Sequence, residues 1–212
     1  ALVPQRYPSY VFVDMNIKRF QYINNKHGRK RADAALKHLY EIASQFLKDD
    51  EYIARVCNDD YNLLLHYCDM DILIKEFLVP LVDAVFDDPD EIFYHNIYLS
   101  FGFYFLEQTP CSFYEAQNKA QITRKKCPHL QRRTFSYDIY HSELYKDFMR
   151  FHETADRVTQ ARFKKEFIPY IQPKIRLCDE AIVGGEVLLR WKTADGCLIP
   201  LSSFLPVLNA NG

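Results

Sequence analysis

The chain lacks an excess of charge of either sign. Its 27 lysine and arginine residues face 28 aspartate and glutamate residues, and the net charge is −1. Proteins that bind nucleic acid or an anionic membrane through their overall field carry a clear positive excess. The stretch Arg124-Lys125-Lys126 is basic, but it flanks a helix end, where cations are favourable anyway. We therefore expect no nucleic-acid partner and no membrane contact by this chain.

Long apolar runs and clustered cysteines are also missing. No run approaches the roughly 18 apolar residues that a membrane-spanning helix needs. The six cysteines form no C-x-x-C pair and no Cys/His spacing typical of a zinc site. These absences favour a reduced cytoplasmic protein, and any membrane anchor is expected upstream in a longer parent. The length of 212 residues fits one domain plus a fragment, or two small domains.

Hydrophobic periodicity predicts alternating strands and helices. We expect strands at 10–13, 52–56, 61–67, 97–106, 167–172 and 181–191, and helices at 32–47, 72–85, 113–126 and 142–165. The second and third strands are joined by a short polar segment, which is a hairpin signal. No β-α-β repeat is evident, so the pattern favours an α+β fold with a mostly antiparallel central sheet flanked by helices.

Four segments in order resemble the motifs of one family. Asn16–Asn25 resembles D-x-D/N-x-F-K-x-I-N-D, and Gly28–Asp33 resembles G-H-x-x-G-D. Arg55–Tyr61 stands where that family has R-x-G-G-D/E-E-F, and Ser100–Gly102 stands where it has S-x-G. Residues 1–140 therefore resemble a GGDEF domain, the domain of diguanylate cyclases. The resemblance implies a nucleotide-cyclase-like palm.

The same resemblance implies a metal site that this chain has partly lost. Joining two GTP molecules into cyclic-di-GMP needs carboxylates that hold Mg²⁺ or Mn²⁺ beside the phosphates. Here Asn16 stands at the strand-end aspartate position, and a neutral amide is a much poorer metal ligand. Asp14 lies two residues earlier on the same strand face and is the alternative ligand. Asp59 keeps an acid of the signature and is the remaining expected ligand.

The signature turn has also diverged, reading Cys57-Asn58-Asp59-Asp60-Tyr61. Cys57 brings a β-carbon into the space that the family's first glycine leaves for the triphosphate, whereas Asn58 tolerates the left-handed conformation. Asp60 is one methylene shorter than the family's glutamate, and Tyr61 replaces a phenylalanine. We therefore expect no catalytic residues in this degenerate domain.

Asn24 and Asp33 match positions that, by resemblance, contact a guanine base. An aspartate can accept hydrogen bonds from both N1–H and N2–H₂ of guanine, which suits recognition of GTP. The alternative is that Asp33 is simply an acid at a helix N-terminus and Asn24 a turn residue.

A second resemblance follows a predicted linker helix at 141–165. Phe167–Lys174 and Gly185–Trp191 resemble the opening of an EAL domain, the cyclic-di-GMP phosphodiesterase barrel. In an intact barrel, this resemblance makes Glu186 a metal ligand and Arg190 a phosphate contact. A (β/α)₈ barrel needs roughly 250 residues, so 166–212 is expected to be an incomplete fragment.

These expectations leave three functional hypotheses. The first is a catalytically inactive regulatory module that binds GTP and tunes an attached EAL domain. The second is part of an active cyclic-di-GMP phosphodiesterase once the barrel is complete. The third is a structural homodimerisation module without a nucleotide, and cyclic-di-GMP is the other ligand that the resemblance suggests.

Overall fold

The computed structural model describes residues 10–67, 69–90, 92, 97–106, 111–127 and 135–211. The chain divides into two compact units, Ala1–Tyr145 and Lys146–Gly212. None of the helices in the described residues is long and apolar enough to cross a membrane.

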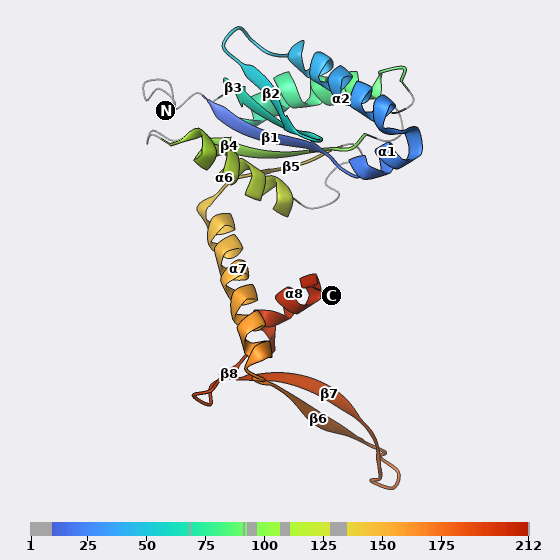
Figure 1. The fold of residues 1–212 in the computed structure, drawn as a ribbon, viewed down its shortest axis with the longest axis vertical. Helices are drawn as coiled ribbons and strands as arrows, with labels where there is room; N and C mark the ends of the chain where they lie inside the picture. The colour runs from blue at the N-terminus through green and yellow to red at the C-terminus, as the bar shows by residue number, and fades with distance from the viewer. Residues whose placement is uncertain are drawn as a thin grey trace. The chain divides into compact units, whose positions relative to one another are not determined.

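The first unit is built on a five-stranded sheet in the order β2-β3-β1-β4-β5 (Figure 1). Its strands are β1 (Val11–Ile17), β2 (Tyr52–Cys57), β3 (Asp60–Leu65), β4 (Leu99–Phe105) and β5 (Phe135–Ile139). Its helices are α1 (Phe20–His27), α2 (Arg29–Ser44), α3 (Met70–Leu73), the π-helix η2 (Ile74–Leu78), α4 (Val79–Phe86) and α6 (Phe113–Lys126). Three strand pairings are antiparallel and β4 pairs with β5 in parallel, so the predicted α+β fold is confirmed with a mixed sheet.

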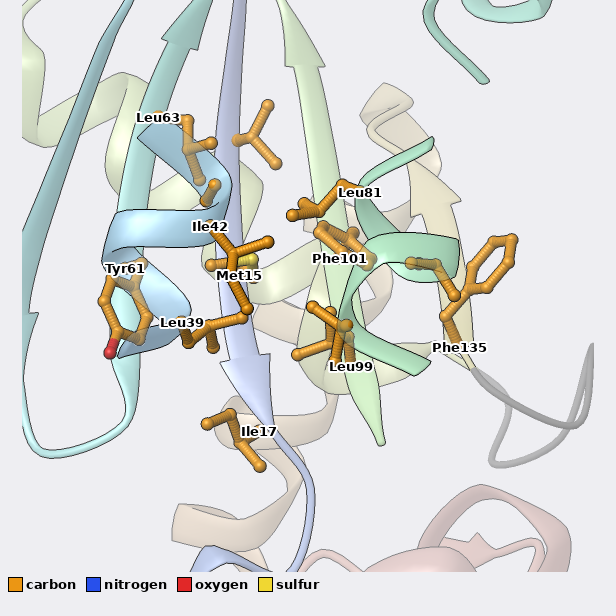
Figure 2. Packing of buried hydrophobic residues seen from close by; sticks show 14 of the residues in the cluster. Met15, Ile17, Leu39, Ile42, Tyr61, Leu63, Leu81, Leu99, Phe101 and Phe135 are labelled. Atoms are coloured by element: carbon orange, nitrogen blue, oxygen red, sulfur yellow. The ribbon is translucent and has the colours of Figure 1, made fainter. Parts of the chain in front are cut away.

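Alternation along β1 separates the two faces of this sheet. Val13, Met15 and Ile17 are buried in the large core. Figure 2 shows Met15 near Leu39 and Ile42 of α2, with Leu81 of α4 in the same core. Phe12 lies on the opposite face, where it packs in a smaller cluster with residues of β4 and α6. Since side chains alternate along a strand, Asp14 and Asn16 share the α6 face with Phe12.

Gly102 sets the distance between α6 and that face. A β-carbon at Gly102 would lie 2.1 Å from the carbonyl oxygen of Ala120 and 2.5 Å from the amide nitrogen of Arg124. The missing side chain thus lets the helix backbone approach the sheet closely. It fixes where the last turns of α6 meet β1.

Several boundaries differ from the sequence predictions. Helix α1 and strand β5 were not expected, and β1 runs to Ile17 rather than ending before Asp14. Helix α1 and strand β5 are both short, and α1 buries only Phe20 and Ile23. Neither segment therefore shows a clear hydrophobic period in the sequence. The helix expected at 72–85 contains η2, where Val79 N–H bonds to Ile74 O. Pro80 near its end supplies no N–H, which accounts for the altered ladder.

The second unit has a three-stranded sheet in the order β6-β7-β8. Its elements are β6 (Phe167–Ile175), β7 (Ile182–Lys192), β8 (Leu198–Ile199) and α8 (Leu201–Asn211), and α7 (Ser142–Phe163) leads into it. Its small core joins Val158 and Ala161 of α7 to Trp191 and to Phe204 and Val207 of α8. Most of the β6–β7 hairpin is exposed.

Candidate functional site

The signature turn joins β2 to β3 as a tight hairpin, as predicted. Asn58 adopts a left-handed conformation with φ of 46°, whereas Cys57 does not have a positive φ. Only the second of the two diverged glycine positions therefore needs glycine-like freedom, and asparagine tolerates it. Arg55 closes the turn by donating a hydrogen bond from Nε to the carbonyl oxygen of Asn58 at 2.7 Å.

Asn16 faces the two acids of the turn from the neighbouring strand, where it is paired with Asp60. Its Nδ2 donates to a carboxylate oxygen of Asp59 at 2.7 Å and to one of Asp60 at 2.8 Å. Two acceptors on the same side of the amide fix its orientation, because the amide oxygen in that place would face two carboxylates. Cys57 Sγ lies 3.8 Å from the other oxygen of Asp60.

Arg124, from the last turn of α6, completes this cluster. Its Nη2 donates to Asp60 at 3.0 Å, and its Nε donates to the carboxylate of Asp14. Arg124 is 6% exposed and Asp14 is 2% exposed, so this ion pair is buried. The Asp14 carboxylate, predicted as the alternative metal ligand, is therefore paired with Arg124.

The donor set does not suit a divalent metal. Hard cations in proteins need several free oxygen ligands. Here one oxygen of Asp59 and one oxygen of Asp60 accept from the amide N–H₂ of Asn16, and the same Asp60 oxygen also accepts from the guanidinium of Arg124. The described residues contain no group of three or more His, Cys, Asp or Glu side chains that could hold a metal ion.

Burial raises the pKa of two of these carboxyl groups, those of Asp14 and Asp59. Desolvation raises the pKa of Asp14 to about 6, and the charge of Arg124 beside it limits that rise. Desolvation also raises the pKa of Asp59, and hydrogen bonds from its own backbone amide and from Asn16 oppose this rise.

Tyr61 lies on the other face of the sheet, where its hydroxyl donates to the carbonyl oxygen of Leu36 at 2.7 Å. Burial raises the pKa of Tyr61 to about 12.

A polar cleft of about 530 Å³ lies next to this cluster. Its walls come from α1, α2 and the signature turn, and its lining is Phe20, Gln21, Asn24, Asn25, Arg29, Asp33, Arg55, Asn58 and Asp59. The structure thus brings the predicted residues Asn24 and Asp33 together with Asp59. The volume falls within the ordinary range for small-molecule sites, roughly 300–1,000 Å³.

The alternative hypothesis, that Asp33 is an acid of the first helical turn, is wrong. Helix α2 begins at Arg29, and its first turn contains no acidic residue. Asp33 instead lies one turn further on, with 55% of its side chain exposed and an oxygen 3.8 Å from Nη2 of Arg55. Asn24 lies within α1 rather than in a turn.

Comparison with known proteins decides the family. A family model described as "Diguanylate cyclase, GGDEF domain" matches residues 4–123. The chain belongs to the GGDEF family. The signaling protein YkoW of Bacillus subtilis is 24% identical over 207 residues, which are 95% of this chain and 25% of that protein. The chain thus spans a quarter of the length of this relative.

Solved structures share the fold of the GGDEF domain. The active GGEEF domain of a diguanylate cyclase from Vibrio cholerae superposes with a TM-score of 0.52 at 16% identity, over 63% of this chain and 83% of that one. The Vibrio cholerae LapD structure, containing S helix, GGDEF and EAL parts and bound to c-di-GMP, gives a TM-score of 0.50 at 14% identity. It covers 97% of this chain and 47% of that chain. At these identities the likeness shows the fold alone.

The second unit places Glu186 and Arg190 on one face of β7. Glu186 is exposed and pairs across the hairpin with Gln172, and Arg190 is half-buried and pairs with Ile168. No further acids gather around Glu186 into a metal cluster among the described residues.

Sequence reasoning missed the residues that complete the GGDEF site. Arg124 was read as one of several cations at a helix end, because nothing in the sequence places it beside Asp14, 110 residues away. The amides Gln21 and Asn25 were missed because α1 was not predicted, and Arg29 was missed because α2 begins at Arg29, three residues before the predicted start. Arg55 belongs to the signature, but its place in the sequence does not predict its contact with Asp33.

Proposed function

We propose that this GGDEF domain binds a guanine nucleotide but does not synthesise cyclic-di-GMP. The observation that carries the proposal is the pair of hydrogen bonds from Asn16 to Asp59 and Asp60. Synthesis needs carboxylates that hold divalent metal at the reacting phosphates. In this domain the acids instead bind side-chain donors, and Arg124 supplies the positive charge beside them.

The cleft supports nucleotide binding without turnover. Asn24 and Asp33 both line it, and both side chains reach solvent there. The Asp33 carboxylate is suited to accept from N1–H and N2–H₂ of guanine, and the Asn24 amide both donates and accepts. Asn24 and Asp33, which would bind and orient the base, are thus present in the cleft. The signature acids Asp59 and Asp60, by contrast, accept hydrogen bonds from Asn16.

The wider proposal concerns the parent protein. We assign residues 1–140 to the degenerate GGDEF module, 141–165 to a linker helix and 166–212 to the start of an EAL domain, which the module would tune. Coverage of 97% of the chain by a GGDEF-EAL structure supports this division. A cytoplasmic setting is part of the same proposal.

An active phosphodiesterase in the complete parent is the second candidate. It is favoured by the pairing of Gln172 with Glu186, because this register joins the Q-P-K segment to the E-V-L-L-R-W segment. Glu186 would then be a metal ligand and Arg190 a phosphate contact in the finished barrel. A chain extended past Gly212 that hydrolyses cyclic-di-GMP, and loses the activity in Glu186→Gln, would support it.

Two measurements on the 212-residue chain test the main proposal. Incubation with GTP and Mg²⁺ or Mn²⁺ should give no cyclic-di-GMP, and detectable product would overturn the loss of synthesis. Calorimetric titration with GTP should show binding that Asp33→Ala weakens and Asp71→Ala, an exposed acid outside the cleft, leaves unchanged. If neither the wild type nor either variant binds GTP, the hypothesis of a structural homodimerisation module is favoured instead.

A further inference from the structure

The lining of the cleft is rich in neutral amides and balanced in charge. Four of its nine residues are asparagine or glutamine, namely Gln21, Asn24, Asn25 and Asn58. The charged residues are two arginines, Arg29 and Arg55, and two aspartates, Asp33 and Asp59. Amides donate and accept hydrogen bonds without charge, which suits the edge of a base and not a polyanion.

The positive charge of Arg55 is offset by a neighbouring aspartate. Its Nε already donates to Asn58 O at 2.7 Å, and its Nη2 lies 3.8 Å from Asp33. Arg29 is the only cationic side chain of the cleft without an ion pair among the described residues. It is the first residue of the 16-residue helix α2, whose N-terminus has no side-chain cap. This end of the cleft can therefore serve one phosphate group.

Beyond Arg29, the described lining of the cleft offers the remaining phosphates of a triphosphate no cation without an ion pair. Arg124 is buried and bonded to Asp14 and Asp60, so its charge is already neutralised. Asp59 forms part of the cleft wall and would repel an anion beside it. A divalent metal, which normally cancels such repulsion, does not fit the donor set that Asn16 and Arg124 present.

We infer that the cleft recognises the guanine base, is nearly indifferent to the number of phosphates, and needs no divalent metal. This inference rests on the proposed guanine-nucleotide site and narrows its ligand class to guanine nucleosides and their mono- to triphosphates. Arg124 donates to Asp14 and to the signature acid Asp60, so its positive charge is paired within the domain and is not offered to the ligand.

Calorimetric titration of the 212-residue chain with guanosine, GMP and GTP tests the inference, each ligand being measured with Mg²⁺ and with EDTA. Dissociation constants should agree within about fivefold, since an exposed ion pair to Arg29 contributes no more than that. Chelation of the metal should change none of them. GTP binding that exceeds guanosine binding by about 100-fold, or that disappears in EDTA, would overturn the inference.

Two variants separate the base from the phosphate. Asn24→Leu should weaken guanosine and GTP by the same factor, whereas Arg29→Gln should weaken GMP and GTP by up to about fivefold and leave guanosine unchanged. Lys26→Gln, on α1 but outside the lining, is the matched control for the lost charge and should change nothing. Thermal unfolding of each variant checks that the fold is kept.

The outcomes distinguish the two proposals. Tight binding of GTP alone, dependent on Mg²⁺, would reject the inference and keep the proposed GTP site. Absence of binding for all three guanine ligands would reject both. Equal binding of ATP and GTP would remove the base specificity on which both depend.

Discussion

The amide nitrogen of Asn16 lies 2.7 Å from a carboxylate oxygen of Asp59 and donates a hydrogen bond to it across 43 positions of sequence. A single nitrogen also serves Asp60, so one neutral side chain stands between the two acids of the signature. Because both acids accept from it, the amide takes the role of a cation in holding them together.

Replacing Asn16 by aspartate should convert the cluster into a metal site. Asn16→Asp removes both hydrogen bonds and places three carboxylates together, so we expect a loss of about 1–3 kcal/mol in the free energy of unfolding without metal. Mn²⁺ should then raise the unfolding temperature of the variant and leave the wild type unchanged. Asn25→Asp, an exposed amide of the same cleft, is the control. An equal response to Mn²⁺ in wild type and Asn16→Asp would contradict the assignment.

Adding a methyl group at Gly102 should displace α6. The new β-carbon would meet backbone atoms of Ala120 and Arg124 at 2.1 and 2.5 Å, which no rotamer change relieves. We expect Gly102→Ala to lower the free energy of unfolding by about 1–3 kcal/mol or more in urea titrations. Gly184→Ala on β7, where a β-carbon meets no atom within 4 Å, should cost much less. Similar losses in both variants would argue against a close helix approach.

The buried carboxyl of Asp14 should make stability depend on pH. Its pKa is about 6 in the folded chain and 3.8 as the ordinary value, so the folded state binds more protons between these values. Stability therefore falls as pH rises from about 4 to 6, by up to ~1.4 kcal/mol per unit from this group, and then levels off.

Urea unfolding of the wild type and Asp14→Asn across this pH range isolates that contribution. The difference in unfolding free energy, wild type minus variant, should decrease as pH rises to about 6 and stay constant above it. Asp71→Asn, at an exposed position of α3, provides the control. A difference that is flat, or that grows with pH in this window, would show that Arg124 outweighs desolvation at Asp14.

The left-handed conformation at Asn58 predicts unequal tolerance within the turn. With φ of 46°, a β-branched residue is strained there, so Asn58→Val should cost about 1–2 kcal/mol while Asn58→Gly should be close to neutral. Cys57 lies in strand β2 without a positive φ, so Cys57→Val should be tolerated. Thermal unfolding of the three variants measures this, and an equal cost for valine at both positions would contradict the turn geometry.

Much of the fold followed from local patterns. The start of the first strand, the hairpin of β2 and β3, and the helix at 113–126 all match the structure, because each depends on local composition, side-chain period or turn chemistry within a few residues. Helix α1 and strand β5 were not predicted because both are short. The π-helix was not predicted because its period differs from that of an α-helix.

Some features of the site likewise follow from the sequence, and others follow only from the tertiary structure. Sequence alone determined the diverged turn, the loss of the aspartate at Asn16, and the presence of Asn24 and Asp33 as base-contact candidates. Only the tertiary structure decided where the charges go. Arg124 reaches Asp14 and Asp60 because α6 crosses the sheet at Gly102, and that crossing depends on close packing between segments far apart in sequence. Local patterns hold no information on such a contact, so the pairing of Arg124 with Asp14 and Asp60 follows only from the packing of α6 on the sheet.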